Sequence, residues 1–336
     1  MKRDKILLAH GSGGELSREL IEEIIYPIFD NNGGQELLDS AFLALEGGRI
    51  AMTTDSYVIS PLFFPGGDIG KLAACGTIND LAVCGAIPKF LSVGLIIEEG
   101  FPVEDLKKIL RSLSDTAASA GVLIVTGDTK VVERGSADKI FINTTGIGIV
   151  PEGVSLGPTE ISVGDLIIIS GMVGDHGMAV LCQREGLSLG GQIASDCAPL
   201  SDLAELLVST GGVSCMRDPT RGGVASVLYE LARQSKMTME ILNEAVPVHH
   251  AVAAGCSMLG LDPLYLANEG KLLIFARPEK ESEIMNVLRN HPLGRAGRVI
   301  GRVTSRDDSG KVLVETELGA KRILPVLEGE HLPRIC

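Results

Sequence analysis

The sequence predicts two domains, each of which mixes α-helices with β-strands. The chain has 336 residues and a hydrophobic content of 45%, which is enough to bury two separate cores. Segments with helical spacing alternate with short apolar segments typical of strands in both halves. Proline and glycine cluster at residues 151–158, so we place the domain boundary near residue 155.

The first half contains three predicted helices and four predicted strands. Residues 15–26 have helical spacing, and residues 70–86 are so rich in Ala, Gly and Cys that a very closely packed helix is expected. Pro102 opens the clearest helix, with acidic residues in its first turn and an apolar stripe up to Gly121. Apolar runs predict strands at residues 50–54, 89–97, 122–126 and 139–150.

The second half repeats this mixture and then loses its pattern. We expect helices from about residue 177 and at residues 222–234 and 278–290, and strands at residues 166–170, 271–276 and 299–303. After Gly319 no regular pattern is visible, and Pro325 and Pro333 favour an extended tail. Such a tail spans on the order of 55 Å when fully extended.

Composition excludes several classes of protein. The net charge of −13 argues against nucleic-acid binding, because attraction to phosphates needs a basic surface. No apolar run reaches membrane-spanning length and the N-terminus lacks a signal-peptide core, so a cytoplasmic, soluble protein is expected. The seven cysteines include no C-x-x-C pair, which makes a disulfide framework or a zinc ribbon improbable.

The last residue, Cys336, places a thiol on the most mobile part of a chain. A thiolate is the best nucleophile among common side chains. The tail is therefore interpreted as an arm that carries a group on sulfur. The alternative is an exposed cysteine without a role.

Three aspartates follow apolar runs and stand beside small or polar residues, namely Asp55, Asp80 and Asp128. Carboxylates just beyond strand ends would converge at a sheet edge and suit Mg²⁺, which keeps waters for substrate phosphates. The alternative is three solvated turn residues. Asp80 is the hardest to dismiss, because it lies in an otherwise apolar stretch where an unpaired carboxylate is costly.

Other motifs are ambiguous when taken singly. The run His10-Gly11-Ser12-Gly13-Gly14 precedes a helix and could cover phosphates or form a flexible loop. Three further positions each allow a chemical and a structural reading. Asp218 could bind a metal or cap a helix, Glu269 could be a general base or a solvated turn residue, and His176 is a weak metal candidate beside a glycine-rich turn. Lys130, two residues after Asp128, is equally open.

In chain order, these motifs form a pattern that covers nearly the whole sequence. They read His-Gly-Ser-Gly-Gly, Thr-Asp-Ser, Gly-Thr-Ile-Asn-Asp-Leu-Ala, Thr-Gly-Asp-Thr-Lys, Gly-Asp-His-Gly, Asp-Pro-Thr-Arg-Gly-Gly, Asn-Glu-Gly-Lys and Pro-Arg-Ile-Cys. The pattern closely resembles the HypE family, the carbamoyl dehydratases of nickel–iron hydrogenase maturation. That family belongs to the PurM-like, or aminoimidazole-ribotide-synthetase-like (AIR synthetase-like), ATP-binding superfamily. The Pro-Arg-Ile-Cys end discriminates best, because other superfamily members are not expected to carry it.

The resemblance implies an α+β fold with two PurM-like domains. Residues 1–155 would form the N-terminal ATP-binding domain, residues 156–318 the C-terminal domain, and residues 319–336 a mobile tail with the terminal cysteine. The N-terminal sheets of two subunits would pair into a barrel, so a homodimer is expected.

The resemblance also implies a reaction. The carbamoyltransferase HypF would place a carbamoyl group on the sulfur of Cys336, and the tail would then enter the ATP site. Phosphorylation of the thiocarboxamide oxygen, followed by loss of a proton and of phosphate, leaves a thiocyanate. Cyanide then passes to the iron centre on the HypC–HypD complex.

The roles of single residues follow from the same resemblance. Metal binding is expected, with ATP and Mg²⁺ as cofactors, at Asp55, Asp80, Asp128 and Asp218. Nucleotide binding is expected at His10, Gly11, Ser12, Gly13, Gly14, Asp55, Asn79, Asp80 and Thr129. Cys336 carries the substrate and Glu269 accepts the proton, while Lys130 is its partner or anchors the substrate oxygen. The roles of Glu269 and Lys130 could be exchanged.

Two other functions stay open. A selenophosphate synthetase of the same superfamily would carry Cys or Sec near the N-terminal glycine loop, whereas the first cysteine here is Cys75. A carrier or scaffold would bind nucleotide and present Cys336 to partners without chemistry.

Overall fold

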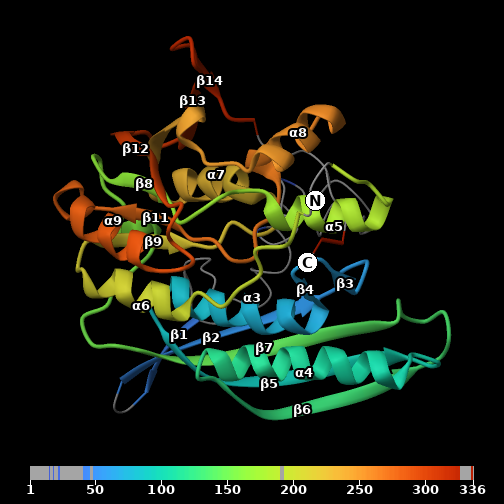
Figure 1. Ribbon diagram of the computed structural model, residues 1–336. Coiled ribbons are helices and arrows are strands. Elements are labelled where there is room, and N and C mark those ends of the chain that lie inside the picture. Colours follow the sequence, from blue (N-terminus) through green and yellow to red (C-terminus); the bar gives the residue numbers. More distant parts are fainter. Residues whose placement is uncertain are drawn as a thin grey trace.

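The computed structural model describes residues 41–45, 48–189, 193–325 and 334–335, together with Glu15, Arg18 and Glu22. Two sheet-based units follow one another along the chain (Figure 1). The His10–Gly14 loop, Cys336 and most of the helix predicted at residues 15–26 lie outside the described residues. No helix in the described ranges has the length and apolar character needed to cross a membrane.

The first unit is built on a five-stranded sheet with the order β1-β2-β7-β5-β6. Its neighbours pair antiparallel except for β5 and β6, which run parallel. The strands are β1 (Ala41–Leu45), β2 (Gly48–Tyr57), β5 (Ile87–Glu98), β6 (Leu123–Val132) and β7 (Ile140–Val150). A separate two-stranded hairpin pairs β3 (Phe63–Phe64) with β4 (Gly67–Asp68).

Among the described residues, two helices cover one face of this sheet (Figure 1), and both lie where the sequence predicts helices. α3 (Ile69–Val83) is capped by Asp68, whose Oδ1 accepts hydrogen bonds from the backbone amides of Gly70 and Lys71. Thirteen of its fifteen residues are buried, which confirms the closely packed helix expected from its small side chains. α4 (Val103–Ser119) starts directly after Pro102 and packs Ile109 and Leu113 into the core.

The second unit has a seven-stranded sheet covered on both faces. Its order is β14-β13-β10-β12-β8-β11-β9. Along β8, Ile167 and Ile169 face α7, whereas Leu166 and Ile168 face α6 and α9, as alternation along a strand requires. The strands are β8 (Leu166–Ile169), β9 (Val213–Arg217), β10 (Met237–Leu242), β11 (Leu273–Ala276), β12 (Arg298–Arg306), β13 (Lys311–Glu315) and β14 (Lys321–Ile323). The helices are α5 (Asp175–Glu185), α6 (Ser201–Ser209), α7 (Gly223–Ser235), α8 (His250–Leu259) and α9 (Glu281–Asn290).

Regular structure continues further towards the C-terminus than the sequence predicts. The expectation that no regular element follows Gly319 is wrong, because β14 pairs antiparallel with β13. Gly319 adopts a φ of 75°, and its amide donates to the carbonyl of Thr316, so the chain turns back onto β13. The C-terminal domain therefore does not end at residue 318, because its sheet includes β14 up to Ile323.

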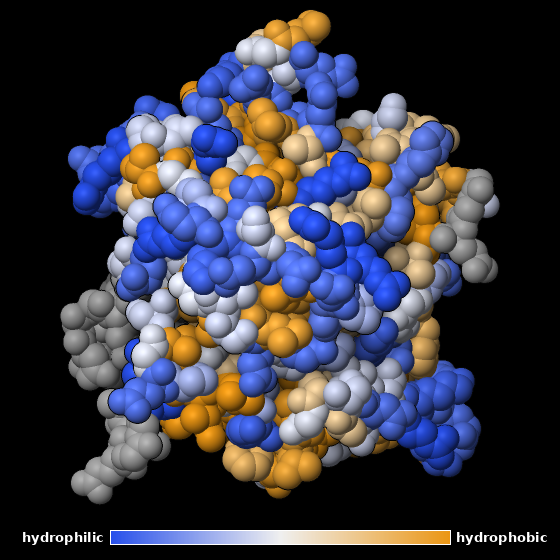
Figure 2. Space-filling view, turned by 60° about the vertical axis from the view of Figure 1, so that its left-hand side comes forward, coloured by the Kyte–Doolittle hydropathy of each residue, from blue (hydrophilic) through white to orange (hydrophobic). Residues whose placement is uncertain are grey.

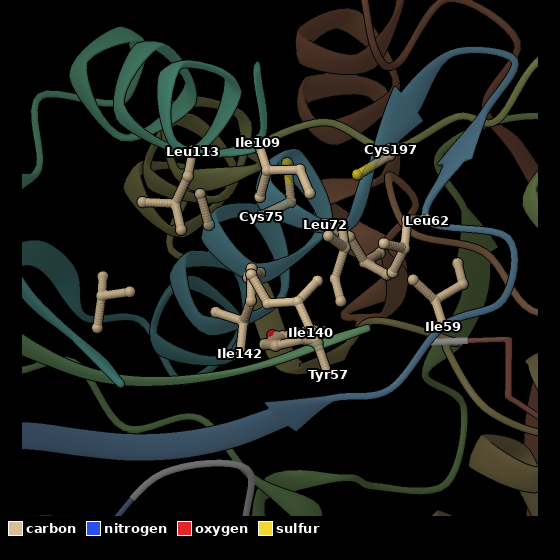
Figure 3. Packing of buried hydrophobic residues seen from close by; sticks show 14 of the residues in the cluster. Tyr57, Ile59, Leu62, Leu72, Cys75, Ile109, Leu113, Ile140, Ile142 and Cys197 are labelled. Atoms are coloured by element: carbon tan, nitrogen blue, oxygen red, sulfur yellow. The ribbon is translucent and has the colours of Figure 1, made fainter. Parts of the chain in front are cut away.

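The two units pack against each other around one shared core. Tyr57 and Leu72 of the first half belong to the same hydrophobic cluster as Cys197 of the second half (Figure 3). Ala267 of the second half is a further member of this cluster. Ile335, near the end of the chain, belongs to this cluster too. We call this contact region the domain junction, and it positions the site described below.

Candidate active site

The first unit contributes Asp55 of β2 and Asp80 of α3 to the domain junction. The hydroxyl of the buried Tyr57 donates to Oδ2 of Asp55 at 3.1 Å, and the Thr53 hydroxyl donates to Oδ2 of Asp80 at 2.8 Å. Burial, followed by the negative charges of Asp55 and Asp80, raises the pKa of Tyr57 well above its usual value. Glu269 contributes to this pKa shift as well, which brings a residue of the second unit into the same electrostatic site.

The position of Tyr57 depends on a glycine in α3. A Cβ atom at Gly76 would lie 2.2 Å from the Tyr57 hydroxyl oxygen, which no real side chain allows. Gly76 thus lets the tyrosine lie against the helix and reach Asp55.

Asp55 and Asp128 do not follow strand ends, so this expectation is wrong for both, whereas Asp80 lies in the helix predicted at residues 70–86. Asp55 lies within β2, Asp128 lies within β6, and Asp80 lies within α3. The apolar runs end at residues 54 and 126, but backbone pairing with β7 and β5 carries both strands further. Hydrophobic patterning cannot detect such an extension, because ladder hydrogen bonds do not depend on side-chain polarity.

Within one protomer, Asp128 and Lys130 lie apart from Asp55. Across the paired strands, Asp128 lies in one row with Gly94, Asn143 and Ser56. Asp55 lies in the neighbouring row, opposite Thr144. Neighbouring rows point to opposite faces, so Asp128 and Lys130 are on the face that α3 and α4 leave uncovered. Three strand spacings, about 14 Å, also separate β6 from β2. Asp128 and Lys130 form an exposed ion pair at 3.1 Å, and Thr129 between them points to the opposite face.

On the side of the second unit, Asn268 connects three sequence motifs. Its Nδ2 donates to the carbonyls of Pro219 at 2.9 Å and Leu266 at 3.0 Å, and its Oδ1 accepts from the Gly174 amide at 2.8 Å. Asn268 is fully buried. It therefore brings the loop of Asp218, the turn before α5 and the segment of Glu269 together at the domain junction.

A short segment, residues 195–198, fixes the backbone around Glu269. Oδ1 of Asp196 accepts from the Glu269 amide at 3.1 Å, and Oδ2 pairs with Nζ of Lys271 at 2.9 Å. The Ala198 amide donates to the Glu269 carbonyl at 3.2 Å. A Cβ at Gly270 would lie 1.9 Å from the Asp196 carbonyl oxygen, so only glycine permits this crossing.

Asn79 holds the other side of the same segment. Its Nδ2 donates to the Ala198 carbonyl at 3.2 Å, and its Oδ1 accepts from the Leu200 amide at 2.8 Å. The side chain is buried and both ends of its amide have backbone partners. Asn79 thus joins α3 to the segment that positions Glu269.

The chain end, Arg334 and Ile335, is held at the domain junction. Arg184 donates from Nη2 to the Arg334 carbonyl at 2.7 Å and from Nε to the Ser60 carbonyl at 2.8 Å. Nε2 of His176 lies 2.8 Å from the Ile335 carbonyl oxygen, and Ile335 is only 3% exposed. Arg334 also forms an ion pair with Asp138.

His176 is fully buried and has a partner on each ring nitrogen, Ile335 on Nε2 and Ser195 on Nδ1. This leaves no ring nitrogen for the metal-ligand interpretation of His176. Among the described residues, no group of three or more His, Cys, Asp or Glu side chains is placed to hold a metal ion.

The sequence did not reveal several residues that shape the site, namely Tyr57, Arg184, Ser195 and Asp196. Tyr57 lies two residues after Asp55, but none of the four residues is itself part of a motif singled out from the sequence. The hydrogen-bond partners of Arg184 and Asp196 are more than 70 positions away in the chain, so no local spacing could have marked these two residues.

The family comparisons agree with the two-sheet fold. Residues 38–150 match the family described as AIR synthase related protein, N-terminal domain, and residues 162–313 match the corresponding C-terminal domain. Fold and site together thus define a two-domain protein of the AIR synthase related class. Thiamine monophosphate kinase from Aquifex aeolicus shares this fold with a TM-score of 0.66 and 19% identity, covering 91% of this chain and 99% of that one.

Relatives that match over their full length identify the family within the AIR synthase related class. Carbamoyl dehydratase HypE of Rhizobium leguminosarum bv. viciae is 49% identical over 334 residues, covering 99% of this chain and 95% of the relative. The HypE of Escherichia coli (strain K12) is 47% identical over 338 residues, covering 99% and 100%. This chain belongs to the HypE family of carbamoyl dehydratases, which confirms the family predicted from its motifs.

Two solved structures of the family add to this. A HypE crystallised in complex with ATP is 47% identical, covers 99% of this chain and 100% of that one, and has a TM-score of 0.83. A HypE–HypF complex contains a chain that is also 47% identical, with a TM-score of 0.86, covering 92% of this chain and 99% of that one.

Proposed function

We propose that this chain is an ATP-dependent carbamoyl dehydratase that acts on a group carried by its own terminal cysteine. The observation that carries the proposal is the position of Ile335, the residue before Cys336, which is buried at the domain junction. Membership of the HypE family and the ATP complex of a relative support the activity and the nucleotide. The product is a thiocyanate that supplies the cyanide ligand of the iron in nickel–iron hydrogenase.

The chemistry requires a change of leaving group. The substrate is a thiocarboxamide, in which the sulfur of Cys336 bears C(=O)NH₂. Its oxygen is a poor leaving group until the γ-phosphoryl group of ATP is transferred to it, which releases ADP. The C–O bond then breaks with departure of phosphate, both N–H protons are lost during the sequence, and the C≡N bond forms on sulfur.

We assign proton removal from nitrogen to Glu269. The residue is 2% exposed, and its backbone is fixed on both sides, by Asp196 on the amide and by Ala198 on the carbonyl. A carboxylate in a fixed position close to the reacting nitrogen is the arrangement that general base catalysis needs. Tyr57 is not assigned a proton-transfer step, because its raised pKa keeps the hydroxyl protonated.

Asp55 and Asp80, together with Asp218, would hold Mg²⁺ only when ATP is bound, because no three acidic side chains converge among the described residues and the phosphates would complete the set of ligands. Carboxylate oxygens are the ligands this ion prefers, and Asp55 and Asp80 lie close enough together to act jointly on the pKa of Tyr57. When bound, the ion offsets the negative charge of the phosphates during transfer. Thr53 orients the Asp80 carboxylate for this purpose. The glycine loop His10–Gly14 and Thr129 complete the proposed nucleotide site. Both ends of the Asn79 amide are bonded to the backbone, so Asn79 supports the site through residues 198–200 and not by direct contact with the nucleotide.

We further propose a homodimer formed through the uncovered face of the five-stranded sheet. That face exposes Met52, Phe90, Ile96 and Ile149 by 40% or more each, an unusual number of large apolar side chains for one sheet face. Hydrophobic surface is visible at the lower part of the molecule, where the five-stranded sheet lies (Figure 2). Asp128 and Lys130 lie on this same face. Metal binding by Asp128 and a role of Lys130 beside Glu269 would therefore be possible only in the active site of the partner subunit.

HypF is the proposed donor of the carbamoyl group, in line with the solved HypE–HypF complex of relatives. The HypC–HypD complex is the proposed acceptor of cyanide, and the cytoplasm is the proposed location. These partners belong to the reaction sequence and are not needed for the dehydration step itself.

The mass of the intact protein tests this proposal. HypF and a carbamoyl source are supplied first, and ATP with Mg²⁺ is added afterwards. A dehydratase loses the mass of one water from the carbamoylated form, and a Cys336→Ala variant remains unmodified throughout. A carbamoyl adduct that persists after ATP addition would instead identify the chain as a carrier.

A further inference from the structure

The hydrogen bonds of His176 fix which of its two ring nitrogens carries the hydrogen. The Ile335 carbonyl can only accept, so Nε2 of His176 carries a hydrogen and donates to it over 2.8 Å. Burial lowers the pKa of His176, so the ring is neutral and Nδ1 is an acceptor. Ser195 then donates its hydroxyl hydrogen to Nδ1 over 2.8 Å, while its oxygen accepts from the Cys197 amide at 3.1 Å.

The ring of His176 is also fixed sterically. Phe64 meets it edge-on with ring centroids 5.4 Å apart and an interplanar angle of 87°. Ser195, in turn, is held by the Pro65 carbonyl, which accepts from the Ser195 amide at 2.7 Å. Both units of the protein therefore contribute to the orientation of this one ring.

Arg184 provides a second contact to the chain end. It bridges the carbonyls of Ser60 and Arg334, and the Ser60 amide also donates to the Arg334 carbonyl at 3.3 Å. All of these contacts are made to backbone carbonyls. The contacts are consequently independent of what is attached to the sulfur of Cys336.

The segment that orients His176 is the one that positions Glu269. Ser195 fixes the histidine, and its neighbour Asp196 accepts from the Glu269 amide. Covalent geometry keeps the Cys336 sulfur within roughly 5 Å of the Ile335 carbonyl carbon. Holding that carbonyl therefore limits where the sulfur can be relative to Glu269.

We propose that His176, oriented by Ser195, and Arg184 form a carbonyl clamp that holds the chain end at the domain junction and so restricts the positions open to the Cys336 sulfur during the reaction. All three act as positioning residues. The clamp recognises the peptide backbone and so retains the thiol, carbamoyl and thiocyanate forms alike. This inference rests on the proposed function for its consequence, but the hold on the chain end can be measured without any dehydration.

The test uses the full-length protein and two readouts. The first is the rate at which iodoacetamide alkylates Cys336, measured by mass spectrometry on the C-terminal peptide. The second is the single-turnover rate of dehydration at saturating ATP after carbamoylation by HypF. The variants are His176→Phe, which removes the donor, His176→Gln, which retains one, and Arg184→Met. Arg289→Met on the exposed side of α9 is the control.

His176→Phe leaves the Ile335 carbonyl buried without its donor, so alkylation of Cys336 should rise and dehydration should fall, each by about 10- to 100-fold. His176→Gln should restore both rates to within a few-fold of the original. Arg184→Met should shift both rates in the same direction as His176→Phe, and ATP affinity should stay unchanged in all variants. A purely structural role for His176 would not be rescued by glutamine.

Unchanged alkylation in both His176→Phe and Arg184→Met would overturn the clamp, as would faster alkylation with normal dehydration. Arg184 is half-buried at the surface, so its variant decides the matter if His176→Phe does not fold. Failure of the proposed function looks different. In that case the original protein would lose no water, while the two substitutions would still expose Cys336 to alkylation.

Discussion

Removal of the Lys271 ammonium should destabilise the second unit and displace Glu269. Lys271 and Asp196 form a buried ion pair at 2.9 Å, with side chains that are 10% and 4% exposed. In Lys271→Met, the Asp196 carboxylate remains buried without its cation, although it still accepts from the Glu269 amide. The backbone around Glu269 is therefore expected to shift.

The magnitude follows from the burial of this pair. Breaking a buried ion pair by removing one partner costs roughly 3–5 kcal/mol, because the other charge is left uncompensated. Asp196→Asn should lower the free energy of unfolding by a similar amount, because it leaves the buried Lys271 ammonium without its counter-charge. The double variant removes both charges and should recover at least about 2 kcal/mol relative to the sum of the single variants. Lys107→Met breaks the exposed pair with Glu104 and should cost at most about 1 kcal/mol.

Urea unfolding provides the assay, and circular dichroism is the suitable probe because the chain has no tryptophan. The double-mutant cycle is evaluated on the transition in which the seven-stranded sheet unfolds. Single variants that each cost less than about 1 kcal/mol, or costs that simply add, would refute the reasoning. In parallel, both single variants should slow dehydration without weakening ATP binding.

Three further predictions concern the base, the histidine and the dimer. Glu269→Gln should allow carbamoylation but slow dehydration by about 10²- to 10⁴-fold, as single-turnover rates would show, and a normal rate would remove Glu269 from the mechanism. Burial lowers the pKa of His176 below 6.5, although the hydrogen bond to the Ile335 carbonyl and the charge of Asp196 oppose this shift. The stabilising contribution of the neutral ring is therefore complete above pH 6.5 and is lost as the pH falls. The free energy of unfolding should then drop by up to about 1.4 kcal/mol per pH unit below that value, and His176→Gln should flatten the slope. Phe90→Glu should yield monomers in analytical ultracentrifugation, whereas Leu318→Glu, at a fully exposed site, should not; dimers in both variants would exclude the proposed face.

The sequence predicted those elements whose start or packing is indicated by residues within the element itself. α4 follows Pro102 with acidic residues in its first turn, and the small residues of α3 indicated its close packing. By contrast, α6, α8 and β13 were not anticipated, because their patterns are short and compatible with loops. β14 exists only because a turn at Gly319 directs it onto β13.

Residues of the site could be predicted from the sequence only where they belong to a recognisable local motif. Asp80 was singled out by its apolar surroundings and Glu269 by the family resemblance, and both act on the pKa of the buried Tyr57. The roles of Asp196 and Ser195 depend on contacts with residues far along the chain, which no spacing rule encodes. Likewise, the placement of Asp128 on the opposite sheet face depends on the register across three strand pairs.

The central claim is that the oxygen of a carbamoyl group on Cys336 is phosphorylated in this site and leaves with phosphate. Its most direct test is to carbamoylate the protein with a group whose oxygen is the heavy isotope, add ATP and Mg²⁺, and weigh the inorganic phosphate released. The account predicts that each phosphate carries one heavy oxygen from the carbamoyl group. Phosphate without the isotope, released while the thiocyanate still forms, would contradict it.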